Sequence, residues 1–258
     1  MSLYFKYFKI HFKRELQYKA SFILSFISNL IVFFGYYFSI LCIFDKFDNI
    51  KGFTLYEVLF TFAVVQFGFA FCEVFFRGVD QFDDMMVAGD FDRILLRPRG
   101  VLHQILCEDI SLVRIARLLQ AIIILVIAIL SIDVSWNFEK ILTLIFMIIS
   151  SVLIYLSILI ITAAYCFITI KGLELRNILL YGSKEMTQYP IGVFKKGFVI
   201  IFTYLVPFGF VNYYPLLYLL DKTKNNLLMI SPIVVIVYFI FSVFIFYRLL
   251  RKYKSSGS

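Results

Sequence analysis

Residues 89–98 concentrate charge in a chain that is otherwise apolar. They include two Asp, two Arg, one Phe and three aliphatic residues, and they end on a proline. Carboxylates in a first turn favour a helix N-terminus, and Pro98 prevents a helix from continuing much beyond Arg97. Asp90 is expected to cap this helix with its side chain. Because about two turns of helix are unstable alone in water, docking to another surface must hold them.

The residue types in this helix suit recognition of another protein rather than bond-making chemistry. At helical spacing, Phe91, Ile94 and Leu95 lie within reach of one another and form an apolar face that could enter a groove. Charged side chains around that face can make ionic contacts with a partner. A short helix lying flat on the membrane surface is the alternative. The candidate docking residues are Gly89, Asp90, Phe91, Asp92, Arg93, Ile94, Leu95, Leu96, Arg97 and Pro98.

Groups that could catalyse a reaction or bind a metal are sparse. His11 and His103 are far apart in the sequence, and the four cysteines are scattered, with no pair at metal-ligand or redox spacing. The phosphate-binding pattern G-x-x-x-x-G-K-[ST] does not occur. We therefore expect no enzyme activity from the chain by itself, no metal site and no cofactor.

The composition predicts a membrane protein. The chain has 258 residues, of which 62% are hydrophobic and 16% charged, whereas soluble domains are only about half apolar. This length accommodates about six spanning helices of roughly 20 residues each. The net charge of +8 resides at the borders of apolar runs. It therefore indicates membrane orientation and no nucleic-acid partner.

Uncharged runs predict the spans of an all-α polytopic membrane protein. The second and third runs are short, so we extend them by some turns to cross a hydrocarbon core about 30 Å thick. Arg114 and Arg117 are then expected to snorkel toward one interface. The six predicted spans are 20–44, 55–76, 112–132, 141–170, 197–220 and 225–247.

Basic residues predict the orientation of these spans. Twenty of the 25 Lys and Arg fall in the N-terminal segment, residues 77–117, residues 171–196 and the C-terminal tail. The positive-inside rule then places both termini in the cytoplasm. Residues 77–111 become a cytoplasmic loop. The whole of residues 1–254 is expected to form one membrane domain, and residues 255–258 are typical of an artificial tail.

An amphipathic helix is predicted before the first span, within residues 1–19. Such a helix lies in the membrane interface, and membrane lipid is therefore a predicted partner. A charged flank that merely anchors the first span is the alternative. The apolar face holds Phe5, Phe8, Phe12 and Leu16, and the basic face holds Lys6, Lys9 and Lys13.

Two regions resemble type 2 ABC exporter permeases, in particular their six-span branch. In that family a Gly, an acidic residue, a short aliphatic run and a Pro follow the second membrane helix and form the segment that couples to the ATPase. Gly89, Asp92, residues 94–96 and Pro98 match this pattern. The sequences QYPIGVF and LVPFGFVNYYP resemble the family's paired-proline region before the last span. The matching positions, implied to form a re-entrant element or outer gate, are Tyr189, Pro190, Pro207, Tyr214 and Pro215.

The resemblance implies an exporter subunit in a bacterial cell membrane. Two permease subunits, identical or paralogous, would enclose a path, and separate cytoplasmic ABC ATPase subunits would bind and hydrolyse ATP. The cargo implied is amphiphilic or hydrophobic. A self-contained secondary carrier or channel is the alternative, and it would need a titratable path through residues 173–190.

The resemblance also opens a second topology. In the family, the polar helix after the fourth span is itself the fifth span, and the proline-rich stretch is a re-entrant hairpin on the outer side. Here residues 173–190 would cross the membrane, and residues 197–220 would dip in and return around Pro207. Hydropathy favours a straight span over 197–220 instead. Both topologies keep the C-terminus inside. The crossing helix would carry Glu174, Arg176, Lys184 and Glu185.

Overall fold

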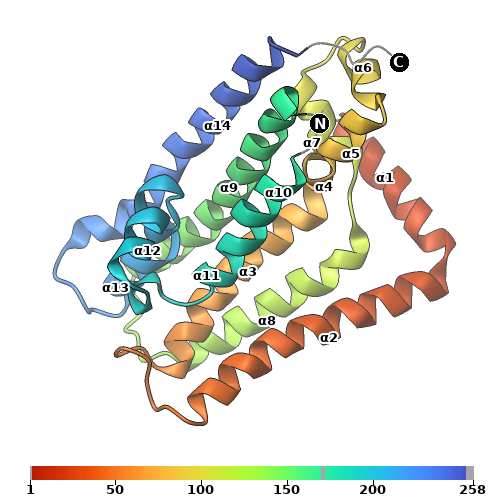
Figure 1. Ribbon diagram of the computed structural model, residues 1–258. Coiled ribbons are helices and arrows are strands. Elements are labelled where there is room, and N and C mark those ends of the chain that lie inside the picture. The colour runs from red at the N-terminus through yellow and green to blue at the C-terminus, as the bar shows by residue number, and fades with distance from the viewer. Residues whose placement is uncertain (1, 170–171, 254–258) are drawn as a thin grey trace.

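The chain is a bundle of helices, and the described residues contain no strand (Figure 1). The computed structural model describes residues 2–169 and 172–253, so the expected tail at 255–258 lies outside the described residues. The fold is that of an all-α polytopic membrane protein. Five helical runs are long and apolar enough to cross a membrane, and they confirm five of the predicted spans. They are α2 (Lys19–Phe44), α3 (Leu55–Phe75), η1 (Leu112–Arg114) with α8 (Ile115–Ser131), α9 (Phe138–Thr169), and η6 (Asn226–Ile233) with α14 (Val234–Leu250).

Short helices gather at one end of the bundle, which we call the terminal end (Figure 1). The first helix lies at this end and turns into α2 at Tyr18, and the last turns of α14 reach the same end. The predicted helix after the second span is present there as α6. The helices of the terminal end are α1 (Ser2–Gln17), α4 (Arg77–Asp80), α5 (Phe82–Val87), α6 (Asp90–Leu95) and α7 (Val101–Glu108).

A polar helical run connects the two ends of the bundle. It consists of α10 (Leu173–Arg176), η2 (Asn177–Gly182) and α11 (Ser183–Thr187). Arg176 pairs with Asp83 of the terminal end, whereas the Thr187 carbonyl, at the other end of the run, accepts a hydrogen bond from Asn212. We call the opposite end the hairpin end.

A bent pair of helices follows and forms a hairpin. Its two halves meet at 93°, at Pro207, which has no N–H and cannot continue a helical ladder. Val193, before the pair, and Leu219, at its close, both join the apolar cluster of the hairpin end. The elements are η3 (Ile191–Val193), α12 (Lys196–Ile200), η4 (Ile201–Leu205), η5 (Gly209–Tyr213) and α13 (Tyr214–Leu219).

The straight helix expected from hydropathy over 197–220 is therefore wrong, because the stretch bends by 93°. The bend agrees with the re-entrant alternative, in which residues 173–190 cross the membrane, and that topology stays a prediction. Phe208, at the bend, packs on Tyr155 of α9 with ring centroids 5.2 Å apart, so the hairpin dips into the bundle and returns. Non-helical backbone is tolerated at this depth because protein buries it. Lys195 and Lys196 consequently lie toward the hairpin end and not with the basic residues of the terminal end.

Helix α3 lies at the centre of the bundle and is buried along nearly its whole length. It begins with a capping box, in which the Glu57 carboxylate accepts the Thr54 backbone N–H at 2.9 Å. Gly68 lets α9 approach closely, because a Cβ at this position would lie 2.4 Å from the Ser151 backbone oxygen. The central helix thus links the terminal end to the hairpin end through tight packing.

Candidate functional site

The short helix α6 begins on a glycine. Gly89 adopts a left-handed backbone (φ 76°) and is the N-cap residue, a conformation that glycine allows without a Cβ clash. Asp90 is the first helical residue and makes no side-chain cap, so the expectation that it caps the helix is wrong. Asp90 and Asp92 still place two carboxylates in the first turn, where they suit the helix dipole. The helix ends at Leu95, before Pro98.

Part of the α6 face that was expected to enter a partner is instead buried in the chain's own core. Phe91 is 0% exposed and Ile94 3%. The Phe91 ring packs edge-on against Phe82 and Tyr253, with centroids 5.1 Å apart in both cases. These two apolar residues therefore anchor α6 and cannot serve as the docking face, which corrects the expectation for Phe91 and Ile94.

A different surface of α6 faces outward. Leu95 is 39% exposed and Leu96 86%. On the same segment, Arg93 forms an exposed ion pair with Asp90 at 3.1 Å, and Pro98 is also exposed. Exposed leucines bordered by charges form a surface suited to docking.

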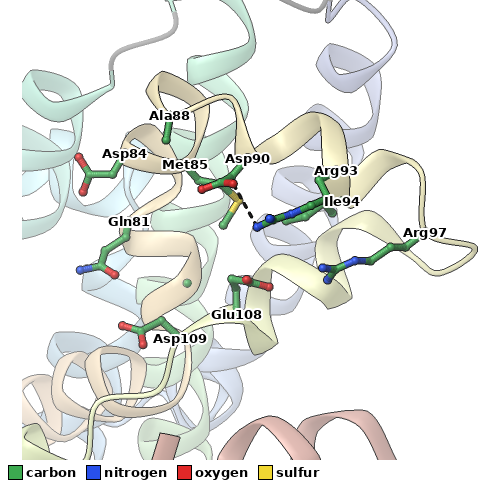
Figure 2. A pocket seen from close by; sticks show the side chains of 11 residues that line it. Gln81, Asp84, Met85, Ala88, Asp90, Arg93, Ile94, Arg97, Glu108 and Asp109 are labelled. Carbon is green, nitrogen blue, oxygen red and sulfur yellow. Dashed lines mark ion pairs between the residues drawn. The ribbon is translucent and has the colours of Figure 1, made fainter. Parts of the chain in front are cut away.

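A crevice of about 300 Å³ lies beside this surface, between α5, α6 and α7 (Figure 2). Carboxylates and guanidinium groups both line it, so it can accept a polar side chain from outside. Its charged lining comprises Asp84, Asp90, Arg93, Arg97, Glu108 and Asp109.

Hydrogen bonds tie α6 to both ends of the chain. The Tyr253 hydroxyl, just after α14, donates to Asp92 at 3.0 Å. Arg97 donates to the Tyr7 hydroxyl of α1 at 3.2 Å. Movement of α6 would therefore be felt by the last span and by the first helix.

Charged groups at the cytoplasm-facing edge predicted for α3 and α8 are paired. The buried Glu73 carboxylate accepts hydrogen bonds from both Arg114 and Arg117. Arg117 also donates to Asn29 of α2 at 2.7 Å. The buried carboxylate at the end of α3 thus offers the two arginines a charge-assisted contact, and snorkelling toward an interface stays a prediction. The position of Glu73 at the end of the predicted second span was the available sequence signal.

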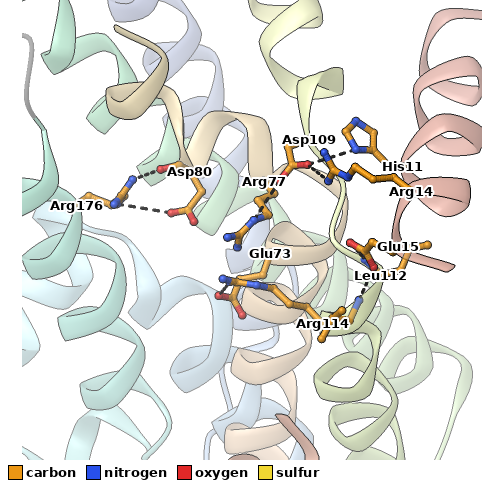
Figure 3. A network of polar contacts seen from close by, with 11 residues as sticks. His11, Arg14, Glu15, Glu73, Arg77, Asp80, Asp109, Leu112, Arg114 and Arg176 are labelled. Carbon is orange, nitrogen blue, oxygen red and sulfur yellow. Dashed lines mark hydrogen bonds and ion pairs between the residues drawn. The ribbon is translucent and has the colours of Figure 1, made fainter. Parts of the chain in front are cut away.

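Asp109, after α7, lies close to one histidine and two arginines (Figure 3). His11 and Arg14 of α1 lie 3.4 and 2.8 Å from one carboxylate oxygen, and Arg77 of α4 lies 3.2 Å from the other. Tyr4 adds a hydrogen bond to the Phe75 carbonyl at 3.0 Å, and burial raises its pKa to about 12. The first helix is thus fastened to the ends of α3 and α7.

Glu15 fastens α1 to the start of the third span. Its two carboxylate oxygens accept the backbone N–H groups of Leu112 and Val113, both at 3.1 Å, so this carboxylate caps the η1–α8 run. Burial raises the pKa of Glu15, and the two N–H donors oppose that change.

Arg176 links the polar helical run to the terminal end. It contacts Asp80 and Asp83 in the α4–α5 region, with Nη1 2.8 Å from the Asp83 carboxylate. Asp80 is buried, and burial raises the pKa of its carboxyl although Arg176 acts in the opposite direction. The network of Figure 3 thereby extends from α1 to α10.

One face of the polar run is left uncovered. Lys184, by contrast, is buried, and its Nζ atom lies 3.3 Å from the Glu185 carboxylate and 4.5 Å from the centre of the Tyr36 ring. The exposed face includes two carboxylates, which are costly to place against lipid. Its residues recur every three or four positions and are Glu174, Asn177, Ile178, Tyr181, Gly182 and Glu185.

The five candidate gate residues lie in the hairpin or directly before it. Tyr189 and Pro190 form the turn after α11, Pro207 is at the bend, and Tyr214 and Pro215 open α13. Tyr189 packs with the cluster of the hairpin end, and Pro215 occupies the first turn of α13, where its missing N–H costs nothing.

Metal chemistry has no candidate site in the described ranges, where no three His, Cys, Asp or Glu side chains come together. The four cysteines are free thiols, of which Cys72, Cys107 and Cys166 are buried. Burial raises the pKa of Cys107, which disfavours the reactive thiolate.

The fold and this site define a polytopic membrane protein with an exposed charged and apolar segment around α6 at one end and a bent pair of helices at the other. A family model described as ABC-2 family transporter protein matches residues 30–257. Because this match covers most of the 258 residues, the chain belongs to the ABC-2 transporter family. Comparison with curated proteins and with solved structures gave no match.

Proposed function

We propose that the chain is the permease subunit of an ATP-driven exporter in a bacterial cell membrane. Family membership gives it a transport permease role. The observation that carries the finer proposal is α6, a two-turn helix pinned from within by Phe91 and presenting Leu95 and Leu96 outward. Separate cytoplasmic ABC ATPase subunits bind this surface and supply ATP hydrolysis, so the chain needs no cofactor and is no enzyme alone.

Force would pass from α6 into the bundle through its tethers. Closure of the ATPase subunits displaces α6, and the contacts of Asp92 with Tyr253 and of Arg97 with Tyr7 transmit the displacement to α14 and α1. A partner shifts a conformational equilibrium only through contacts that differ between the two states. The exposed leucines and the neighbouring crevice are the contacts proposed to differ.

A second permease subunit, identical or paralogous, completes the path. The uncovered face of the polar run supports this proposal, because Glu174 and Glu185 need water or protein beside them within a membrane. The hairpin residues Tyr189, Pro190, Pro207, Tyr214 and Pro215 are proposed to gate the outer end of that path. Both chain termini are proposed to be cytoplasmic, and the cargo is amphiphilic or hydrophobic.

The coupling role is tested by Leu96→Asp and Leu95→Asp. A photo-crosslinking amino acid at position 96 first identifies the contacting protein in cells, which should carry an ATP-binding loop. The complex is then purified and reconstituted. A carboxylate buried without a partner should weaken ATPase binding about 100-fold and abolish cargo-stimulated hydrolysis.

The matched control is Phe47→Asp, an equally drastic change at a 60% exposed residue before α3. This variant should insert, bind the ATPase and transport as the parent does. If position 96 crosslinks only to lipid and Leu96→Asp transports normally, α6 is a membrane-surface helix and the coupling proposal fails.

A further inference from the structure

A crevice of about 230 Å³ lies in the elbow between α1 and α2. The elbow is formed at Tyr18, whose backbone (φ −111°, ψ 67°) is not helical. The apolar run of α2 begins directly after it, so the crevice lies where the first span enters the membrane. This position is the depth of lipid head groups.

One wall of the crevice carries donors for an anion. Ser21 and Ser25 project from successive turns of α2, at the i, i+4 spacing that puts them on one face. Arg14 reaches in from α1, and its side chain is 57% exposed, although it also pairs with Asp109 at 2.8 Å. A guanidinium beside hydroxyl groups is a donor set that suits phosphate oxygens.

The lining also has an apolar part, which comes from two spans. Phe22 of α2 and Val113 at the start of the third span form it. An acyl chain can lie along these side chains, whereas a small soluble anion gains nothing from them. The crevice therefore has a polar part that suits a phospholipid head group and an apolar part that suits an acyl chain.

The acidic residue in the lining does not oppose an anion strongly. Both carboxylate oxygens of Glu15 are directed at the N–H groups of Leu112 and Val113. Lys13 and Lys19 flank the elbow and are exposed. The first turn of α2 holds no acidic residue, so the positive end of that helix dipole is not neutralised locally.

We propose that this elbow crevice binds an anionic glycerophospholipid, with the phosphate at Arg14, Ser21 and Ser25 and an acyl chain along Phe22 and Val113. Basic pockets at the ends of spans are suited to such head groups. The bound lipid would join α1, α2 and the start of α8. Through Arg14 and Asp109 it would also brace the network that carries α4 and α7. The proposal requires neither a coupled ATPase nor a particular membrane orientation.

Native mass spectrometry of the full chain in neutral detergent tests the site. Dioleoyl phosphatidylglycerol is titrated against dioleoyl phosphatidylcholine, and the first bound lipid is quantified. We expect at least about a tenfold preference for phosphatidylglycerol. Arg14→Gln should reduce that binding about tenfold, which is the loss expected for one charge-assisted hydrogen bond. Lys9→Gln, which removes the same charge from an exposed position of α1, should change it less than about twofold.

A second pair of variants leaves the ion pair of Arg14 with Asp109 intact. Ser21→Leu fills the crevice and should block phosphatidylglycerol. Ser39→Leu, the same change at an exposed serine near the far end of α2, should bind as the parent does. Thermal unfolding without added lipid shows whether each variant is folded.

Three results would overturn the proposal. The first is equal binding of the two lipids by the parent. The second is equal loss of binding in Ser21→Leu and Ser39→Leu, or in Arg14→Gln and Lys9→Gln. The third is displacement of the lipid by millimolar glycerol phosphate, which would make the site one for a soluble anion.

Discussion

Burial affects the pKa of the Asp80 carboxyl more than its ion pair with Arg176 does. The side chain is 8% exposed, and its Oδ1 atom lies 3.7 Å from Arg176 Nε without a hydrogen-bond partner. Arg176 instead directs a guanidinium N–H at Asp83. The raised pKa of Asp80 has burial as its main cause, because an incompletely solvated carboxylate favours its neutral form.

This raised pKa predicts a pH dependence of stability. In the unfolded chain Asp80 ionises near its usual pKa of about 3.9, whereas in the folded chain it ionises at higher pH. The folded state then binds more protons over that interval, so the free energy of unfolding falls as pH rises from about 4 through the folded pKa. Asp80→Asn removes this contribution, and its stability relative to the parent should rise with pH over the same window.

Thermal unfolding in detergent between pH 4.5 and 8 measures that difference. Asp84→Asn is the matched control, since it removes an exposed carboxylate from α5 and gives the baseline for losing one carboxylate at this end of the bundle. A constant offset between Asp80→Asn and the parent would show that Asp80 has an ordinary pKa.

At this scale the sequence predicted a helix after the second span but not which of its apolar residues are buried. Charge density drew attention to residues 89–98, and Pro98 correctly limited the helix. Helical spacing grouped Phe91 with Leu95, but it cannot distinguish a residue that faces the chain's own core from one that faces a partner. The core around Phe91 is supplied by Phe82 and Tyr253, which come from well before and far after it in sequence.

At the scale of elements, the run from Leu173 to Thr187 combines a buried face with an uncovered polar face. Hydropathy passed over this run because its polar residues lower the average, and it favoured 197–220 because that stretch is apolar. Hydropathy measures composition only. It does not register that Arg176 forms an ion pair with Asp83 or that Pro207 bends the apolar stretch. Only the resemblance to a family indicated a bend at Pro207 in place of a straight helix.

The uncovered face predicts water access within the membrane. In a cysteine-free background, Asn177→Cys and Gly182→Cys should react with a small hydrophilic thiol reagent about 100 times faster than Ile127→Cys, because only the hydrated thiolate reacts. Ile127 is 41% exposed on α8 and serves as the lipid-facing control. A Cβ at Gly182 meets its nearest neighbour at 3.8 Å, so the variant should fold.

Failure of both cysteines to react with the thiol reagent would distinguish a subunit contact from a lipid-facing surface. If neither Asn177→Cys nor Gly182→Cys reacts, and the two positions instead form disulfides between copies on oxidation, the face is a subunit contact without a water path. Reaction no faster than that of Ile127→Cys, without crosslinks, would mean that lipid covers the face and that the proposed path is wrong.

At the scale of the whole molecule, the two ends of the bundle differ in the number of basic residues that they carry. At the hairpin end, Lys222 lies 2.7 Å from Glu57 and Lys140 2.7 Å from Asp221. The terminal end carries the longer series of cations, including the exposed lysines of α1. Moving Lys195 and Lys196 to the hairpin end reduces this asymmetry but does not reverse it. The positive-inside rule therefore still favours a cytoplasmic terminal end.

Single cysteines in a cysteine-free background test this orientation in intact cells with an impermeant thiol reagent. Asn49→Cys, Ser135→Cys and Thr223→Cys at the hairpin end should be labelled from outside, and Ala88→Cys, beside α6, should be labelled only after the cells are opened. Lys195→Cys is the decisive position. A straight span over 197–220 would hold residue 195 on the same side as Ala88, whereas the re-entrant hairpin holds it on the side of Thr223. Labelling of Ala88→Cys in sealed cells would show that the orientation is the opposite one. A cytoplasmic ATPase could then not reach α6, and the coupling proposal would fail.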